Sequence, residues 1–179
     1  MLKIRDGIPK DIREVKSGII KKRLFSLDRF KKSKAVMFYV SFGSEVETWK
    51  MMRDCLMLRK KVIVPYINGM SRALVPVQIG GLEELREGRW GIFQPERKRN
   101  FPLKDIDLVV VPGIAFDRKF FRIGFGKGYY DAFLKKTGCT KVGLCYESQI
   151  TGWIDAERHD ISMDMLITEK RIYRGVERC

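Results

Sequence analysis

A glycine-rich segment at residues 122–131 carries the clearest chemical signal in the sequence. It reads Arg-Ile-Gly-Phe-Gly-Lys-Gly-Tyr-Tyr-Asp, with glycine alternating at Gly124, Gly126 and Gly128. Alternating glycines let a backbone approach a ligand closely, and successive backbone N–H groups can hold phosphate oxygens. A helix that starts directly after the glycines would add its positive N-terminal end to the same site. The segment therefore predicts a phosphate-binding loop.

Charged residues within the segment agree with this prediction. Arg122 and Lys127 supply formal positive charge, and Asp131 could hold a magnesium ion on the same phosphates. The spacing is neither that of a Walker loop nor that of GxGxxG, because the third glycine comes one residue too early for the latter. A plain flexible turn is the alternative interpretation.

The strongest strand signal in the chain precedes this segment. Residues 107–111, Asp-Leu-Val-Val-Val, form an apolar run that Pro112-Gly113 ends. Open parallel sheets bind ligands outside the carboxyl ends of their strands, so the loop that follows is the place to expect a site. We expect this long loop to run to residue 128, followed by a helix at 129–136 that Gly138 terminates.

Apolar runs and helical periodicities alternate along the rest of the chain. Further buried strands are expected at 35–40, 62–65, 141–146 and 165–168, the last of these being the final strand. Helices are expected at 11–30 and 46–56. This alternation predicts an α/β fold, with a three-layer, mostly parallel open sheet and helices on both faces.

Two regions have local signals of their own. Asp11, with Glu14 three residues later, resembles a capping box at the start of the first long helix. Residues 74–99 are irregular, with Pro76 and the pair Gly80-Gly81, and read as a β-rich loop with one short helix.

The composition excludes several classes of protein. The chain has 179 residues, 45% of them hydrophobic, which suffices for one domain over residues 1–179. Its apolar runs are far shorter than the ~20 residues of a membrane-spanning helix, and no secretory signal is evident. Four cysteines without a CxxC pair, and one histidine, argue against a zinc site or a disulfide scaffold. We therefore expect a cytoplasmic protein with free thiols.

The glycine-rich segment and the residues before it resemble the signature of a known enzyme family. Val-Pro-Gly-Ile-Ala-Phe-Asp at 111–117, followed by the segment at 122–131, is similar to the motif of 5-formyltetrahydrofolate cyclo-ligases. Further similar elements are Glu-x-x-Thr at 45–48, Trp-Gly-Ile and Pro at 90–95, and His-Asp, Asp and Thr at 159–168. The resemblance implies ATP- and magnesium-dependent conversion of 5-formyltetrahydrofolate to 5,10-methenyltetrahydrofolate, with release of ADP and phosphate.

The family pattern implies a role for each matching residue. The ATP site would consist of residues in the glycine-rich segment, with the cations at 122 and 127 also catalytic: Arg122, Gly124, Phe125, Gly126, Lys127, Gly128, Tyr129 and Tyr130. Phe125 would have no polar role, because the family varies there. Magnesium would be held by Asp131 and Asp164, and the folate would contact Glu45, Tyr129 and the backbone around Val40.

The N-terminus departs from the family pattern, in which a helix carries a Lys-x-x-x-Arg pair that meets ATP phosphates. Gly7 and Pro9 argue against a full helix here. Lys3 and Arg5 are the expected replacements, while Lys10 and Arg13 stay open as alternatives. The sequence leaves the role of His159, the single histidine, open as well.

The charge is consistent with anionic substrates. The 36 Lys and Arg against 22 Asp and Glu give a net charge of +14. We expect reduced folate and ATP as partners, no nucleic acid, no membrane and a monomeric protein. One alternative is a basic nucleic-acid-binding domain, given the cations among the aromatic residues at 116–125, although no RNP, KH or helix-turn-helix pattern is present. Another is a sugar-phosphate isomerase-like α/β enzyme without ATP hydrolysis.

Overall fold

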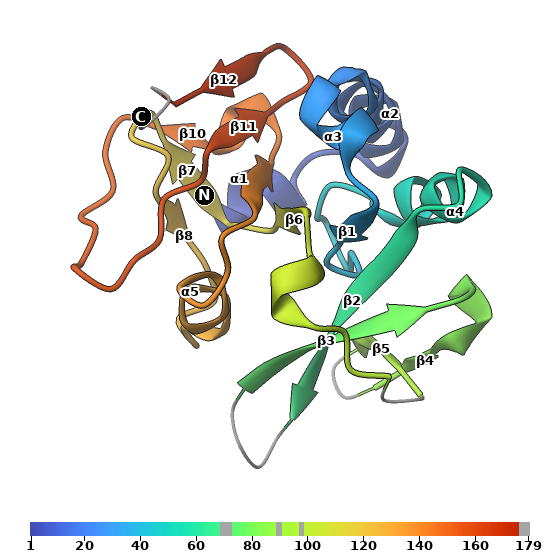
Figure 1. Cartoon of the computed structure of the whole chain (residues 1–179). Coiled ribbons are helices and arrows are strands. Elements are labelled where there is room, and N and C mark those ends of the chain that lie inside the picture. The colour runs from blue at the N-terminus through green and yellow to red at the C-terminus, as the bar shows by residue number, and fades with distance from the viewer. Residues whose placement is uncertain (69–72, 89–90, 97–98, 176–179) are drawn as a thin grey trace.

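A computed structural model describes residues 1–68, 73–88, 91–96 and 99–175. The described residues form a seven-stranded central sheet with the order β12-β11-β9-β6-β1-β2-β3 (Figure 1). Its strands are β1 (Ala35–Met37), β2 (Lys61–Asn68), β3 (Ala73–Ile79), β6 (Leu108–Val111), β9 (Thr140–Leu144), β11 (Met165–Ile167) and β12 (Ile172–Arg174). The five inner strands are parallel, and the two edge strands are antiparallel to their neighbours.

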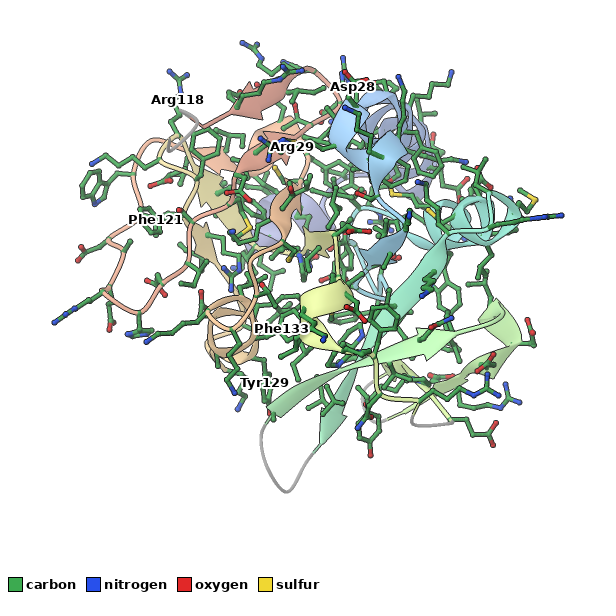
Figure 2. The ribbon with its side chains drawn as sticks, viewed as in Figure 1. Asp28, Arg29, Arg118, Phe121, Tyr129 and Phe133 are labelled. Atoms are coloured by element: carbon green, nitrogen blue, oxygen red, sulfur yellow. The ribbon has the colours of Figure 1, made fainter. Side chains whose placement is uncertain are left out.

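Side chains of β1 alternate between two hydrophobic cores, one on each face of the sheet. Val36 and Phe38 join the first core, and Ala35 and Met37 join the second. Helices α2 (Lys10–Ser26), α3 (Asp28–Lys32) and α4 (Trp49–Met57) cover the first face. Helix α5 (Tyr129–Leu134) covers the second face, where Phe133 is buried (Figure 2). The prediction of a three-layer, mostly parallel α/β sheet is confirmed.

The segment expected to be one long loop before the glycines contains a second, small sheet. Strand β7 (Ala115–Asp117) pairs with β8 (Arg122–Ile123) on one side and with β10 (Ile150–Thr151) on the other. The buried Asp117 carboxylate organises the turn between β7 and β8 by accepting hydrogen bonds from the backbone N–H groups of Lys119 and Phe121. Arg118 lies on this turn and is exposed (Figure 2).

The edges of the sheet differ from the sequence prediction. Residues 165–168 do not form the final strand, because β12 follows and closes that edge with antiparallel pairs to β11. At the opposite edge β3 is a regular strand paired with β2 over seven residues, including a Pro65–Pro76 pair. The rest of the β-rich region holds η1 (Leu82–Glu84), β4 (Leu85–Glu87) and β5 (Phe93–Pro95), followed by η3 (Leu103–Asp105).

The N-terminal helices also differ from the prediction. The capping box is absent, because α2 begins at Lys10 with Pro9 at its N-cap and no side-chain cap bond. Proline suits a helix start, since it lacks an N–H group and its φ is fixed near the helical value. Asp11 therefore falls inside the first turn. A short helix, α1 (Leu2–Asp6), precedes Gly7.

Other helix boundaries were placed slightly wrong by the sequence. Helix α4 starts at Trp49, so Val46 precedes it, and α5 ends at Leu134, well before Gly138. The three described cysteines, Cys55, Cys139 and Cys145, are free and buried. Within the described chain, no helix has both the length and the apolar character needed to cross a bilayer.

Candidate functional site

The glycine-rich loop lies between β8 and α5, and two of its glycines are required by the backbone. Gly126 and Gly128 have φ values of +74° and +64°, and Gly128 is the N-cap of α5. Gly124 has an ordinary φ, and a Cβ there would meet no atom within 4 Å. The loop is exposed from Ile123 to Gly128, so its backbone is open to a ligand. Because α5 is only six residues long, its dipole is a minor contribution.

Arg122 and Asp131 form a largely buried ion pair that holds the two ends of this loop together. Arg122 Nη2 lies 2.9 Å from Asp131 Oδ2, with side chains 6% and 18% exposed. Arg122 Nη1 also donates to the Ile161 carbonyl at 3.3 Å, while Asp131 Oδ1 accepts from the Ile161 N–H at 3.1 Å. The pair fixes the guanidinium beside the loop and brings the segment around Ile161 to the same place.

Asp164, which was expected to hold magnesium together with Asp131, makes its side-chain hydrogen bond and its ion pair with Lys141. Asp164 precedes β11 and accepts a hydrogen bond from the Lys141 N–H at 2.7 Å, next to the amino end of β9. The sequence analysis gave no role to Asp160, which directly precedes Ile161 and belongs to the His-Asp pair at 159–160. Asp160 therefore lies on the segment that is bonded to Asp131. Among the described residues no cluster of three or more metal-ligating side chains occurs.

Arg5 is an N-terminal cation that lies between the loops after β1 and β6. Its side chain is buried, with Nε donating to Ser44 Oγ at 2.9 Å and Nη1 reaching the Gly113 carbonyl at 3.4 Å. Ser44 Oγ in turn donates to the Asp6 carboxylate. Helix α1 is thereby fastened to the loops that follow β1 and β6. Lys3, on the same helix, is exposed.

Glu45 is a nearly buried carboxyl group on the loop that follows β1. Its residue is 9% exposed, and Oε2 accepts from the Phe42 N–H at 3.2 Å. Burial raises the pKa of Glu45 to about 7, although the Phe42 N–H and the Arg5 guanidinium act in the opposite direction. Val40, at the end of the run that begins with β1, is buried as well. Glu45 therefore changes charge near neutral pH.

The loop after β1 contacts the tip of the glycine-rich loop. The rings of Phe42 and Phe125 have centroids 6.1 Å apart, although Phe125 is 55% exposed. This contact is apolar, and the sequence had assigned Phe125 no polar role. The aromatic pair brings the Glu45 side of the site next to the expected phosphate loop.

Tyr129 and Tyr130 begin α5 but have different surroundings. Tyr129 packs against the second core only, whereas Tyr130 packs against both cores. The Arg122 guanidinium lies 5.9 Å from the Tyr130 ring centroid. The Tyr130 hydroxyl oxygen is buried and has no hydrogen-bond partner among the described residues.

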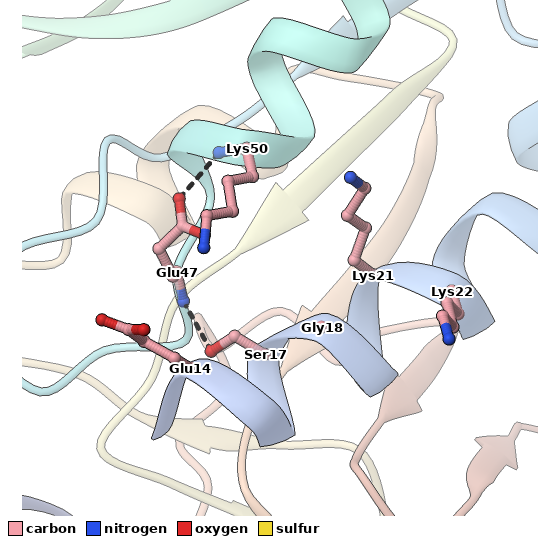
Figure 3. A pocket seen from close by; sticks show the side chains of 7 residues that line it. All are labelled: Glu14, Ser17, Gly18, Lys21, Lys22, Glu47 and Lys50. Atoms are coloured by element: carbon pink, nitrogen blue, oxygen red, sulfur yellow. Dashed lines mark hydrogen bonds between the residues drawn. The ribbon is translucent and has the colours of Figure 1, made fainter. Parts of the chain in front are cut away.

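Two adjacent hollows, each of about 180 Å³, lie between α2 and the residues that follow β1. The first contains Glu45 and is lined by Lys10, Arg13, Glu14, Ser17, Ser41, Phe42, Gly43, Glu47 and Trp49. The second lies between α2 and α4 and shares Glu14, Ser17 and Glu47 with the first (Figure 3). The Glu47 N–H donates a hydrogen bond to Ser17 Oγ at 3.0 Å. Because both residues line both hollows, this bonded pair forms part of the wall that the hollows share.

Polar residues after β9 support the site and were not predicted. The Tyr146 hydroxyl donates to the Glu45 carbonyl at 3.2 Å, and the Gln149 amide donates to the Gly113 and Ile114 carbonyls at 2.9 and 3.1 Å. Their only sequence signal is their place at the carboxyl end of a predicted strand. His159 lies away from this cluster, on an exposed loop beside Glu157, with its side chain 68% exposed.

The comparisons with known proteins agree with this arrangement. A sequence profile of the 5-formyltetrahydrofolate cyclo-ligase family matches residues 1–169. The chain belongs to this family. The resemblance found in the motifs is thus confirmed across the fold, although one of its residues, Trp90, lies outside the described residues.

Individual members of the family are similar over most of the chain. A probable 5-formyltetrahydrofolate cyclo-ligase of Caenorhabditis elegans is 32% identical, covering 78% of this chain and 75% of the relative. One from Schizosaccharomyces pombe is 31% identical, covering 87% and 84%. The solved 5,10-methenyltetrahydrofolate synthetase of Aquifex aeolicus is 34% identical, with a TM-score of 0.86, covering 97% of this chain and 88% of that one. The chain is therefore a ligase by family.

Proposed function

We propose that the protein converts 5-formyltetrahydrofolate to 5,10-methenyltetrahydrofolate, using ATP and magnesium and releasing ADP and phosphate. The observation that supports this most directly is the contact between the two loops. An exposed glycine loop with a fixed arginine suits phosphates, and a buried carboxyl group beside a hollow suits a polar ring system. The Phe42–Phe125 contact brings these two features together, as a reaction between ATP and a folate requires.

The chemistry requires activation of the formyl group. A formamide carbon is a poor electrophile, and its oxygen is a poor leaving group. Transfer of the terminal phosphoryl group of ATP to the formyl oxygen makes that oxygen a good leaving group. The neighbouring nitrogen, at position ten, attacks the carbon and loses its proton, and inorganic phosphate departs with the former formyl oxygen. The protein contributes mainly by positioning the substrates and balancing charge.

The residues divide between the two substrates. Arg122, Lys127 and the backbone of Gly124, Gly126 and Gly128 would hold the ATP phosphates, with Arg5 supplying charge from the N-terminal side. Arg122 is well placed for this, because Asp131 and the Ile161 carbonyl already fix its guanidinium. Glu45, Tyr129 and the backbone near Val40 would hold the folate.

Magnesium that is bound with a nucleotide commonly has one or two protein carboxylates and the substrate phosphates as ligands. The carboxylates of this site suit that kind of binding. Asp131, at the end of the glycine-rich segment, and Asp160, on the segment bonded to it, are the carboxylates that would hold it. The ion would neutralise negative charge on the phosphates. Asp164 is not included, because it lies at the amino end of β9 with Lys141.

The experiment that tests the proposal follows absorbance in the near ultraviolet, where the methenyl product absorbs and the formyl substrate does not. The protein is mixed with 5-formyltetrahydrofolate and magnesium, with and without ATP. We expect the signal to grow only when ATP is present, with ADP released in equal amount. Folded protein that gives no product with ATP, or gives product without it, would overturn the proposal.

A further inference from the structure

Three tyrosine side chains lie around Glu45, and they differ in whether the hydroxyl group has a hydrogen-bond partner. The Tyr39 hydroxyl donates to the Val46 carbonyl at 2.8 Å, and the Tyr146 hydroxyl donates to the Glu45 carbonyl at 3.2 Å. The Tyr130 hydroxyl is equally enclosed, but no described residue accepts its hydrogen bond. Two of the three tyrosines therefore hold the Glu45 loop in place, and the third has an unused donor.

An unused donor at this position calls for an explanation. A buried hydroxyl group without a partner costs about 1–3 kcal/mol, so native structures rarely keep one. Phenylalanine would provide the same packing against both cores without this cost. A ligand that accepts a hydrogen bond from this hydroxyl group would remove the cost, which explains a tyrosine at this position.

The charges around the hydroxyl group indicate which substrate it meets. Burial raises the pKa of Tyr130, and the negative charge of Glu45 raises it further, while the Arg122 guanidinium acts in the opposite direction. The net direction is upward, so the phenol stays a neutral donor. The same Glu45 charge disfavours a polyphosphate next to the hydroxyl group. Of the two cations expected to hold phosphate, Lys127 is exposed on the loop before α5. The Arg122 guanidinium lies 5.9 Å from the Tyr130 ring centroid, but it is already paired with the Asp131 carboxylate at 2.9 Å.

We propose that the Tyr130 hydroxyl donates a hydrogen bond to the reduced folate, beside the Glu45 carboxyl group, and takes no part in ATP binding. This inference rests on the proposed function, and it revises the expectation that Tyr130 belongs to the ATP site. A hydroxyl donor next to a carboxyl group is complementary to a ring edge that carries a carbonyl oxygen beside an N–H group. The pyrimidine part of a pterin has such an edge. Tyr130 is thus a substrate-positioning residue.

The test compares Tyr130→Phe with Tyr173→Phe, which removes a hydroxyl group that is satisfied by Glu147 Oε1 at 2.7 Å on the edge strand β12. Steady-state product formation gives the KM for each substrate separately, and thermal unfolding without ligands gives Tm. For Tyr130→Phe we expect the KM for 5-formyltetrahydrofolate to rise about 3- to 10-fold, the value of one hydrogen bond. The KM for ATP should stay within about twofold, and Tm should be unchanged or higher.

The control variant shows the effect of losing a hydroxyl group that has only a structural role. Tyr173→Phe should lower Tm and leave both KM values unchanged. An unchanged folate KM in Tyr130→Phe, or a rise in the ATP KM alone, would overturn the inference. A second readout, the Tm increase produced by 5-formyltetrahydrofolate without ATP, separates the two proposals. If wild type shows this increase but no turnover, the proposed function fails, and a smaller increase in Tyr130→Phe still supports the inference. If wild type shows neither, both proposals fail.

Discussion

Arg5 Nε donates a hydrogen bond to Ser44 Oγ at 2.9 Å, across 39 positions of sequence. The same guanidinium reaches the carbonyl of Gly113, after β6, and its charge acts on the Glu45 carboxyl group. One side chain thus joins the N-terminal helix to two loops at the carboxyl ends of the sheet.

Replacing Arg5 by lysine tests this arrangement. Lysine keeps the charge but cannot donate to both Ser44 and Gly113 from a planar fork. We expect a loss of about 1–3 kcal/mol in the free energy of unfolding, and a rise of roughly tenfold in the KM for ATP. Urea unfolding and steady-state kinetics measure the two effects. Arg53→Lys, on an exposed side chain of α4, is the matched control and should change neither. If Arg5→Lys changed the free energy of unfolding and the KM for ATP no more than Arg53→Lys does, Arg5 would not belong to the site.

Removing the Lys127 side chain tests the glycine-rich loop. The residue is exposed between two glycines of positive φ, so alanine should leave Tm within a degree or two of the wild-type value. Loss of a charged donor to phosphate should raise the KM for ATP by about 10- to 100-fold. Lys136→Ala, also exposed and just beyond α5, should leave it unaltered. An unchanged ATP requirement in Lys127→Ala would show that the loop binds something else.

The carboxylates proposed to hold magnesium can be tested by asparagine substitutions. Asp160→Asn should raise the magnesium concentration needed for half-maximal rate several-fold, while Tm changes little because its side chain is partly exposed. Asp131→Asn should do the same and also lower stability by roughly 2–4 kcal/mol, since it leaves Arg122 without its ion-pair partner. Asp164→Asn should affect only stability. A magnesium requirement that changes in Asp164→Asn and not in Asp160→Asn would restore the original pairing.

Glu45 should make stability depend on pH. Its pKa is about 7 in the folded protein against 4.5 ordinarily, so the folded state keeps the proton to higher pH than the unfolded state. Its contribution is complete below about pH 4.5 and is lost as pH rises through 7, by up to about 3 kcal/mol. The difference in unfolding free energy between wild type and Glu45→Gln should therefore fall from pH 5 to pH 8. Glu157→Gln, 75% exposed, should show no such trend, and a flat difference for Glu45→Gln would contradict the assignment.

The sequence predicted the elements that depend on local pattern. The inner strands were recognised because a strand that is buried on both faces is a continuous apolar run. Helix α5 was recognised because a helix with one buried face has apolar residues at helical spacing. The small sheet around β7 was missed, since its strands are very short and pair with β10, far along the chain. Strand β12 was missed because only its antiparallel pairing with β11 makes it a strand.

The candidate site was predictable where a compact motif carries it. The motif at 122–131 is contiguous, so its spacing predicts a phosphate-binding loop, and its resemblance to the family signature implies a role for each residue. The resemblance implied Asp164 as a magnesium ligand, and the sequence analysis assigned no role to Asp160, because the bond from the Ile161 N–H to Asp131 joins segments that are 30 residues apart. Tyr146 and Gln149 act through backbone carbonyls of distant loops, and a sequence pattern does not encode such contacts.

The central place of β1 has a consequence for how the protein is made. Strand β1 pairs with β2, which soon follows it, but its other neighbour is β6, which begins only at Leu108. At a synthesis rate of ~5–20 residues per second, β1 emerges from the ribosome roughly 4–14 s before β6 does. During that interval one edge of an entirely apolar strand is unpaired. Unpaired strand edges of this kind are where misassembly of a nascent chain begins.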